Sequence, residues 1–216
     1  MKKDLLLNLA KLRQSKVYDG YNPISNYANG GYECDYVSPY SKSAHNINAE
    51  VMVILQDWSS DENLQGDACE ELNRLGYTPS VRTNINLKNL LEKHLKLDLK
   101  DTYATNLFPY IKKGGMSAHI SPKDMKKAAV EFTLPMLKII KPKIAIALGM
   151  QTFNSLRQSI NLNKVYNMTE AVRSSFMYEN TRIYFQAHPS QQSQNKRGNL
   201  NIVNDWNEMA MYLNNN

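Results

Sequence analysis

Three side chains suited to holding a small planar polar ligand follow strand-like runs in the sequence. Asp57 supplies a carboxylate, Asn106 an amide and His188 an imidazole. A carboxylate can accept a proton or orient water, and an amide presents a donor and an acceptor together. In a neutral imidazole, the ring nitrogen that carries the proton donates a hydrogen bond and the other ring nitrogen accepts one. The residue types therefore predict a polar binding site if the fold brings them together.

The elements that carry these residues read as an alternation of strands and helices. Two of the strand candidates are continuously apolar, as expected of parallel strands buried on both faces. In a parallel sheet of this kind the site lies at the carboxyl ends of the strands. We therefore predict a three-layer α/β/α sandwich around a four-stranded parallel sheet. The predicted strands are 51–55, 102–105, 144–148 and 182–186.

Periodicity and end signals predict the helices. Leu5, Leu6, Leu9 and Leu12 have helical spacing, which favours an amphipathic first helix over a signal peptide. Gly76 is placed to end one helix, and Ser121 followed by Pro122 is placed to begin another. Further helices are expected at about 67–75, 86–97 and 203–213, and after Gly149.

Length and composition indicate one domain, 1–216, with 1–47 as an N-terminal helix and loop region. The formal net charge of +6 suits a polyanionic partner, although a basic protein without one fits equally well. Cys34 and Cys69 cannot form a four-cysteine zinc or iron–sulfur site, so no cofactor or metal is expected. With no apolar stretch of membrane-spanning length, we expect a cytoplasmic monomer without a membrane partner.

Residues 17–47 are rich in Tyr, Asn, Gly and Ser and predict a long ordered loop region. Its tyrosines could stack on bases, but pinning the loop to the core is the favoured interpretation for most of them. The tyrosines concerned are Tyr18, Tyr21, Tyr27, Tyr32, Tyr36 and Tyr40.

Four segments resemble the uracil-DNA glycosylase superfamily, in the same order along the chain. VMVILQDW is similar to the strand and water-activating loop that typically reads VVILGQDPYH, and AHPSQQS is similar to the motif AHPSPLS. TYATNLFPY and IAIALG resemble the middle strands, especially those of the branch with a TN motif. The similarity runs from about residue 34 to 205, although the iron–sulfur cysteines of that branch are absent.

The resemblance implies a role for each matched residue. Asp57 would position or activate the attacking water, and the backbone of Gln56 would face the base. Asn106 would read the pyrimidine edge, and His188 would donate a hydrogen bond to the base O2. Ser190 would bind a phosphate. Each has a simpler alternative, such as a helix cap, a loop contact or a structural hydrogen bond.

Departures from the motifs bear on the substrate. Leu55 replaces a glycine, Trp58 replaces a proline, and Ser59 replaces the tyrosine that crowds C5 of uracil. The small Ser59 predicts space for a C5 substituent. Trp58 would either lie against the base or anchor the core, and the anchor is favoured. Gln192 replaces the intercalating leucine, so Gln191 and Gln192 would fill the gap in the base stack.

The expected function is therefore a DNA glycosylase that flips out uracil or a C5-modified pyrimidine from single- or double-stranded DNA, in repair or anti-phage defence. The alternative is a catalytically inactive nucleic-acid-binding module on the same fold. A small α/β hydrolase is weaker, because the sequence has neither a GxSxG elbow nor a P-loop.

Several lysines and one arginine could contact DNA phosphates. Lys196 and Arg197 are equally well explained as a solvated turn, and Lys112 and Lys113 precede two glycines in what looks like a flexible basic loop. No lysine nucleophile lies in the matched motifs, so strand cleavage is not expected and the enzyme would be monofunctional.

Overall fold

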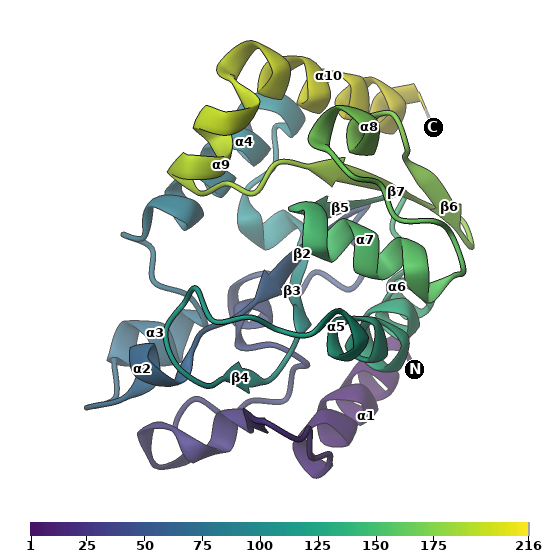
Figure 1. Ribbon diagram of the computed structural model, residues 1–216. Coiled ribbons are helices and arrows are strands. Elements are labelled where there is room, and N and C mark those ends of the chain that lie inside the picture. Colours follow the sequence, from purple (N-terminus) through teal and green to yellow (C-terminus); the bar gives the residue numbers. More distant parts are fainter. Residues whose placement is uncertain (216) are drawn as a thin grey trace.

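A five-stranded sheet forms the middle layer of the fold (Figure 1). The computed structural model describes residues 1–215. The strand order is β3-β2-β5-β7-β6, with parallel pairing from β3 to β7 and antiparallel pairing between β7 and β6. The strands are β2 (Val51–Asp57), β3 (Tyr103–Phe108), β5 (Ile144–Leu148), β6 (Phe176–Tyr178) and β7 (Thr181–Gln186). A separate antiparallel pair joins β1 (Tyr21–Asn22) to β4 (Ile111–Lys112).

The helix ends follow the predicted signals at two places. Gly76 ends a helix in the left-handed conformation, with φ 75°, and the Ser121 hydroxyl accepts a hydrogen bond from the Asp124 backbone. The helices are α1 (Lys2–Ser15), α2 (Asp61–Leu64), α3 (Glu70–Leu75), α4 (Arg82–Leu95), α5 (Pro122–Ala128), α6 (Leu134–Ile140), α7 (Met150–Ser159), α8 (Met168–Val172), α9 (Gln191–Arg197) and α10 (Asn199–Asn215). A π-helical turn, η5 (Ala129–Thr133), joins α5 to α6, and the short 3₁₀ turns are η1 (Ile24–Asn26), η2 (Ala28–Gly30), η3 (Pro39–Ser43) and η4 (Leu99–Asp101).

Successive side chains of β2 pack against helices on opposite faces of the sheet, which gives the fold three layers. Met52 and Ile54 belong to the core cluster that also holds buried side chains of α1, α5, α6 and α7. Val51, Val53 and Leu55 belong to the opposite cluster, with buried side chains of α4 and α10. Successive strand residues point to opposite faces, so a continuously apolar strand needs helices on both sides. The predicted α/β/α sandwich is confirmed (Figure 1).

The prediction of four strands missed β6. This edge strand pairs only with β7, and its three apolar residues are too few to stand out as a strand-like run. The structure also extends β3 beyond its predicted end, to Phe108, so Asn106 lies within the strand, opposite Leu55. Similarly, α9 was not predicted as a helix, because its sequence is polar on every side.

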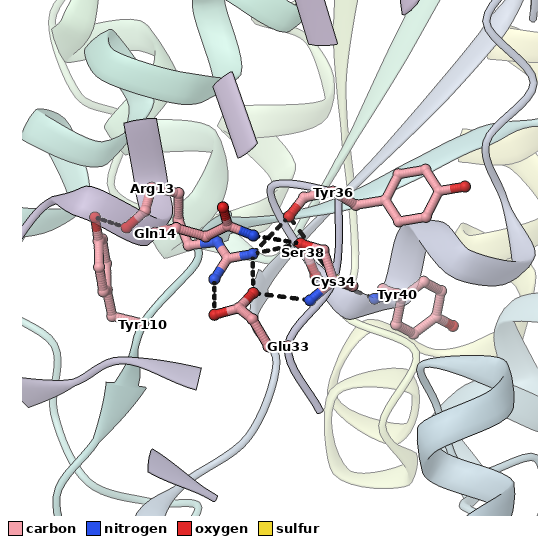
Figure 2. Close-up of polar contacts among 8 residues, drawn as sticks. All are labelled: Arg13, Gln14, Glu33, Cys34, Tyr36, Ser38, Tyr40 and Tyr110. Atoms are coloured by element: carbon pink, nitrogen blue, oxygen red, sulfur yellow. Dashed lines mark hydrogen bonds and ion pairs between the residues drawn. The ribbon is translucent and has the colours of Figure 1, made fainter. Parts of the chain in front are cut away.

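A buried arginine fastens the N-terminal loop region to α1. The Arg13 guanidinium is 1% exposed and donates to the Glu33 carboxylate (2.7 Å) and to the carbonyls of Cys34 and Tyr36 (2.9 Å each), as Figure 2 shows. A buried guanidinium is stable only when its donors are paired in this way. Residues 33–36 are therefore held in one conformation beside α1.

The tyrosines of residues 17–47 mainly pin this region to the core, as predicted. Tyr18, Tyr27, Tyr32 and Tyr40 are each less than 9% exposed. The Tyr27 hydroxyl donates to the Asp61 carboxylate (2.6 Å), and the Tyr32 hydroxyl accepts from the Cys69 backbone (2.9 Å). The region is ordered by these contacts rather than by long helices or strands.

Within residues 1–215, none of the helices combines the length and the apolar character needed to span a lipid bilayer.

Candidate active site

A cavity of about 430 Å³ lies where β2, β3 and β7 end. Asp57, Asn106 and His188 all line it, so the structure brings together the three side chains that the sequence singled out. Gln56, Trp58 and Ser59 line it as well. A concave site of this size is typical of small-ligand binding.

The Asp57 carboxylate lies at the end of β2 and is 7% exposed. Its Oδ1 accepts a hydrogen bond from the Gln56 side chain (3.0 Å). Its Oδ2 lies 2.8 Å from the Lys112 ammonium, yet accepts no well-aligned hydrogen bond from residues 1–215. One oxygen is therefore fixed in place, and the other keeps a lone pair for a ligand or a water.

Lys112 was expected in a flexible basic loop, and that expectation is wrong. The residue is 2% exposed and lies in β4, where its backbone pairs with Tyr21 on one side and bridges to Ser60 on the other. Its ammonium also donates to the Met116 carbonyl (2.5 Å). The nearby glycines led to the prediction of a flexible loop, whereas Lys112 lines the cavity. No local sequence pattern marks Lys112 as buried.

The oxygen of the Asn106 side-chain amide has a hydrogen-bond partner, whereas its nitrogen has none among residues 1–215. It is 1% exposed, and its Oδ1 accepts from the Ser38 hydroxyl (2.5 Å). Ser38 in turn accepts from the Tyr40 backbone N–H (3.2 Å), which lies in the same N-terminal region (Figure 2). The Asn106 Nδ2 has no partner among residues 1–215. A buried unpaired donor costs about 1–3 kcal/mol, so this one is best explained by a ligand acceptor.

The His188 ring is held as a neutral donor. Its Nδ1 accepts from the Ser190 backbone N–H (3.2 Å), which leaves Nε2 to carry the proton. Burial lowers the pKa of His188, and the nearby Asp57 charge opposes this only in part. The loop itself is fixed by Asn86, which donates to the Pro189 carbonyl (2.8 Å), and by Gln194, which donates to the His188 carbonyl (3.1 Å).

The lowered pKa of His188 predicts a loss of stability in mild acid. Because the pKa lies below the ordinary value of 6.5, the folded state binds fewer protons than the unfolded state as pH falls. The stabilisation that comes from a neutral buried His188 is fully present above pH 6.5, and it is lost progressively as the pH falls below 6.5. Urea unfolding at about pH 7.5 and 5.5 should show a larger loss for the wild type than for His188→Gln. Equal losses in the two proteins would contradict the assignment.

Two tyrosines form a wall of the cavity. Tyr40 is one of the loop tyrosines that could stack on bases, whereas Tyr77 was not identified from the sequence. Tyr40 and Tyr77 are buried, and their rings stack at 5.3 Å with an interplanar angle of 29°. Both line the cavity, so an aromatic surface is available to a planar ligand. Tyr77 directly follows the helix-ending Gly76, which was the only local sign that this position has a defined conformation.

Trp58 is held in a fixed position between the loop region and the cavity. Its indole N–H donates to the Gly76 carbonyl (2.7 Å), and its ring meets Tyr32 edge-on at 5.6 Å. Trp58 also lines the cavity, so it shapes the site from this fixed position. The neighbouring Ser59 is 8% exposed and lines the cavity.

The residues predicted to bind DNA lie on and beside α9. The Ser190 hydroxyl caps this helix by accepting from the Ser193 backbone (3.4 Å), which is the simpler of its two predicted roles. Gln191, Gln192 and Lys196 are exposed on the helix. The prediction that they contact DNA is compatible with this exposure.

Arg197 has a different role from the predicted one. Its guanidinium donates two hydrogen bonds to the Asp205 carboxylate (2.7 and 2.8 Å), and another N–H lies 3.3 Å from the Thr169 hydroxyl. These bonds tie α9 to α10 and use the donors that a phosphate would need. Arg197 is therefore a structural residue rather than a solvated or phosphate-binding one.

Within the described chain, no group of three or more His, Cys, Asp or Glu side chains is arranged to hold a metal ion.

Fold and site together define an α/β protein with a polar cavity at the carboxyl edge of its parallel sheet. The chain belongs to the uracil DNA glycosylase superfamily, which it matches over residues 44–210. Proteins of this superfamily are generally DNA glycosylases and act on DNA. A comparison with curated proteins gives no match.

Proposed function

We propose that the protein is a DNA glycosylase that flips a pyrimidine into the cavity and hydrolyses its N-glycosidic bond, leaving an abasic site. One observation carries the proposal. Asp57, Asn106 and His188 line the same cavity, and each has a polar group available to a ligand. The target base must leave the duplex, because its edge and its glycosidic bond are shielded in the stack.

Each group has a distinct task in base release. The free Asn106 Nδ2 donates to an acceptor on the pyrimidine edge, while the Tyr40–Tyr77 wall contacts the base. The neutral His188 donates from Nε2 to O2, where negative charge develops as the base departs. The Asp57 carboxylate favours the positively charged sugar and orients the attacking water.

The substrate we propose is uracil or a pyrimidine substituted at C5. Ser59 lines the cavity with a small side chain, which supports room beside C5. Exposed Gln191, Gln192 and Lys196 on α9 would contact the DNA next to the flipped base. A C5-modified substrate would suit defence against phage with modified DNA, and uracil would suit repair.

The first experiment is base release from a panel of labelled DNA substrates, with alkali used to reveal abasic sites. The panel contains uracil, thymine in a mismatch, 5-hydroxymethylcytosine and its glucosylated form, each in single- and double-stranded DNA. Release of any of these bases supports a glycosylase. Release of uracil alone would remove the argument for an enlarged C5 pocket.

Filling the space at Ser59 should narrow the substrate range. Ser59→Tyr is expected to reduce release of a C5-substituted base relative to uracil by about tenfold to a hundredfold, because the ring competes with the substituent for volume. Ser59→Ala removes the hydroxyl but keeps the space, so its preference should stay unchanged. The measurement is the ratio of single-turnover rates on the two substrates. An unchanged ratio in Ser59→Tyr would place the C5 position elsewhere.

A non-catalytic DNA-binding module is the second candidate, and the Asp57–Lys112 pair favours it. An ammonium 2.8 Å from the carboxylate opposes the charge that would stabilise the reacting sugar. Salt-dependent DNA binding without release from any substrate would support this candidate.

A further inference from the structure

Lys112 is a buried amine to which the proposed base-release reaction gives no task. It lies in the cavity wall, and its ammonium contacts the Asp57 carboxylate and the Met116 carbonyl. Burying a charged pair is costly, and an apolar pair of similar volume often serves stability as well or better. A buried lysine that lines the cavity is therefore a candidate for chemistry.

We propose that Lys112 is an amine nucleophile that forms a Schiff base with the abasic sugar, giving the protein a strand-cleaving lyase activity. The inference rests on the proposed function, because it takes C1′ of the sugar to lie beside Asp57. The Lys112 ammonium lies 2.8 Å from that carboxylate, so a sugar carbon placed beside Asp57 would also lie beside the amine. In the proposed step the Asp57 carboxylate accepts the extra proton of the ammonium and returns it to the aldehyde oxygen as that oxygen leaves as water.

The steps balance without an oxidant or a reductant. After the base has left with the electrons of its C1′–N bond and water has added, the abasic sugar opens to an aldehyde at C1′. The neutral Lys112 amine attacks C1′, and the aldehyde oxygen leaves as water, which gives a protonated imine. The Asp57 carboxylate, free again after giving its proton to the departing water, then accepts a C2′ proton. The C2′–C3′ double bond forms, and the 3′ phosphate leaves with the electrons of its C3′–O bond. Water finally hydrolyses the imine and returns the amine.

The backbone around Lys112 suits a fixed nucleophile. Pairing with Tyr21 and the bridge to Ser60 hold the residue on both sides, and the Met116 carbonyl holds the ammonium. The adjacent Lys113 is exposed instead. Two consecutive lysines thus provide a buried candidate and an exposed control.

The test is borohydride trapping on DNA with a preformed abasic site, which needs no base release. Borohydride reduces the imine to a stable amine, so we expect a covalent protein–DNA adduct, mapped to Lys112 by peptide analysis. Lys113→Gln should still give an adduct that maps to Lys112, whatever its effect on DNA affinity. Lys112→Arg keeps the positive charge beside Asp57 but lacks a nucleophilic amine, so its adduct should be lost. Lys112→Gln should lose it as well.

Binding to a stable tetrahydrofuran analogue of the abasic site shows which variants are folded and can be compared. No adduct in the wild type, an adduct mapped to another residue, or an adduct that persists in Lys112→Gln would overturn the proposal. Base release in the alkali assay together with no trapping would defeat the lyase alone. A covalent adduct at Lys112 would support the lyase without testing base release, because the trapping substrate already contains an abasic site. The release assay therefore remains a separate test of the glycosylase.

Discussion

Asp57→Asn is expected to lower the rate of base release by about 10²- to 10⁴-fold while DNA binding persists. Asparagine keeps the shape and can still accept from Gln56, but it lacks the charge that favours a cationic sugar and orients water. The measurement is single-turnover release on the best substrate of the panel, beside a binding titration. Asp19→Asn, at an exposed position outside the cavity, should leave the rate unchanged.

Asp57→Asn also leaves the Lys112 ammonium buried without its counter-ion, which by itself costs about 3–5 kcal/mol in typical cases. The double variant Asp57→Asn with Lys112→Gln removes both charges and separates the two effects. We expect it to recover stability in urea unfolding but not base release. If it releases base at the wild-type rate, Asp57 has no part in the chemistry.

Gly76→Ala is expected to lower the free energy of unfolding by about 2–5 kcal/mol. The backbone has φ 75°, and an added β-carbon would lie 1.7 Å from the Pro39 carbonyl oxygen. The three nearest atoms all belong to the main chain of Pro39 and Tyr40, which cannot move aside without shifting the turn that carries Tyr40. The hydrogen bond from Trp58 to the Gly76 carbonyl would be disturbed as well.

Gly20→Ala is the matched control for this prediction. Gly20 has φ 84°, but an added β-carbon would meet nothing within 4 Å, so this variant measures the conformational cost without the clash. That cost is about 1–2 kcal/mol. Urea unfolding of the two variants gives the difference. A Gly76→Ala variant no less stable than Gly20→Ala would show that the turn adapts.

The sequence predicted those parts of the fold that depend on local pattern. Continuous apolar runs marked the buried strands, and the edge of the sheet then placed Asp57, Asn106 and His188 together. The sequence did not predict strand β6, because so short an edge strand depends on pairing with its neighbour β7 rather than on its own residues. Arg197 was misjudged for a similar reason, since its partner Asp205 lies in the next helix and nothing in the local sequence pairs them.

The remaining site residues depend on contacts between distant segments. The backbone of Lys112 pairs with Tyr21 and Ser60, and Asn106 is oriented by Ser38, which is 68 positions away in the sequence. A lysine before two glycines and a serine before a proline carry no pattern that predicts these contacts. They follow from the way the loop region packs, which only the folded chain shows.

The anchoring of the N-terminal region has a consequence for how this protein can change. Ser38 and Tyr40 precede residue 44, where the superfamily match begins, yet Tyr40 lines the cavity and Ser38 orients the Asn106 amide. Arg13 holds the segment just before them (Figure 2). Under the proposed function, substitutions in a stretch that bears none of the shared motifs would alter which base is accepted, while Asp57 and His188 stay the same. Substrate choice and reaction chemistry would then be able to evolve separately. A chain trimmed to residues 44–210 would lose the serine that orients Asn106 and a tyrosine of the cavity wall.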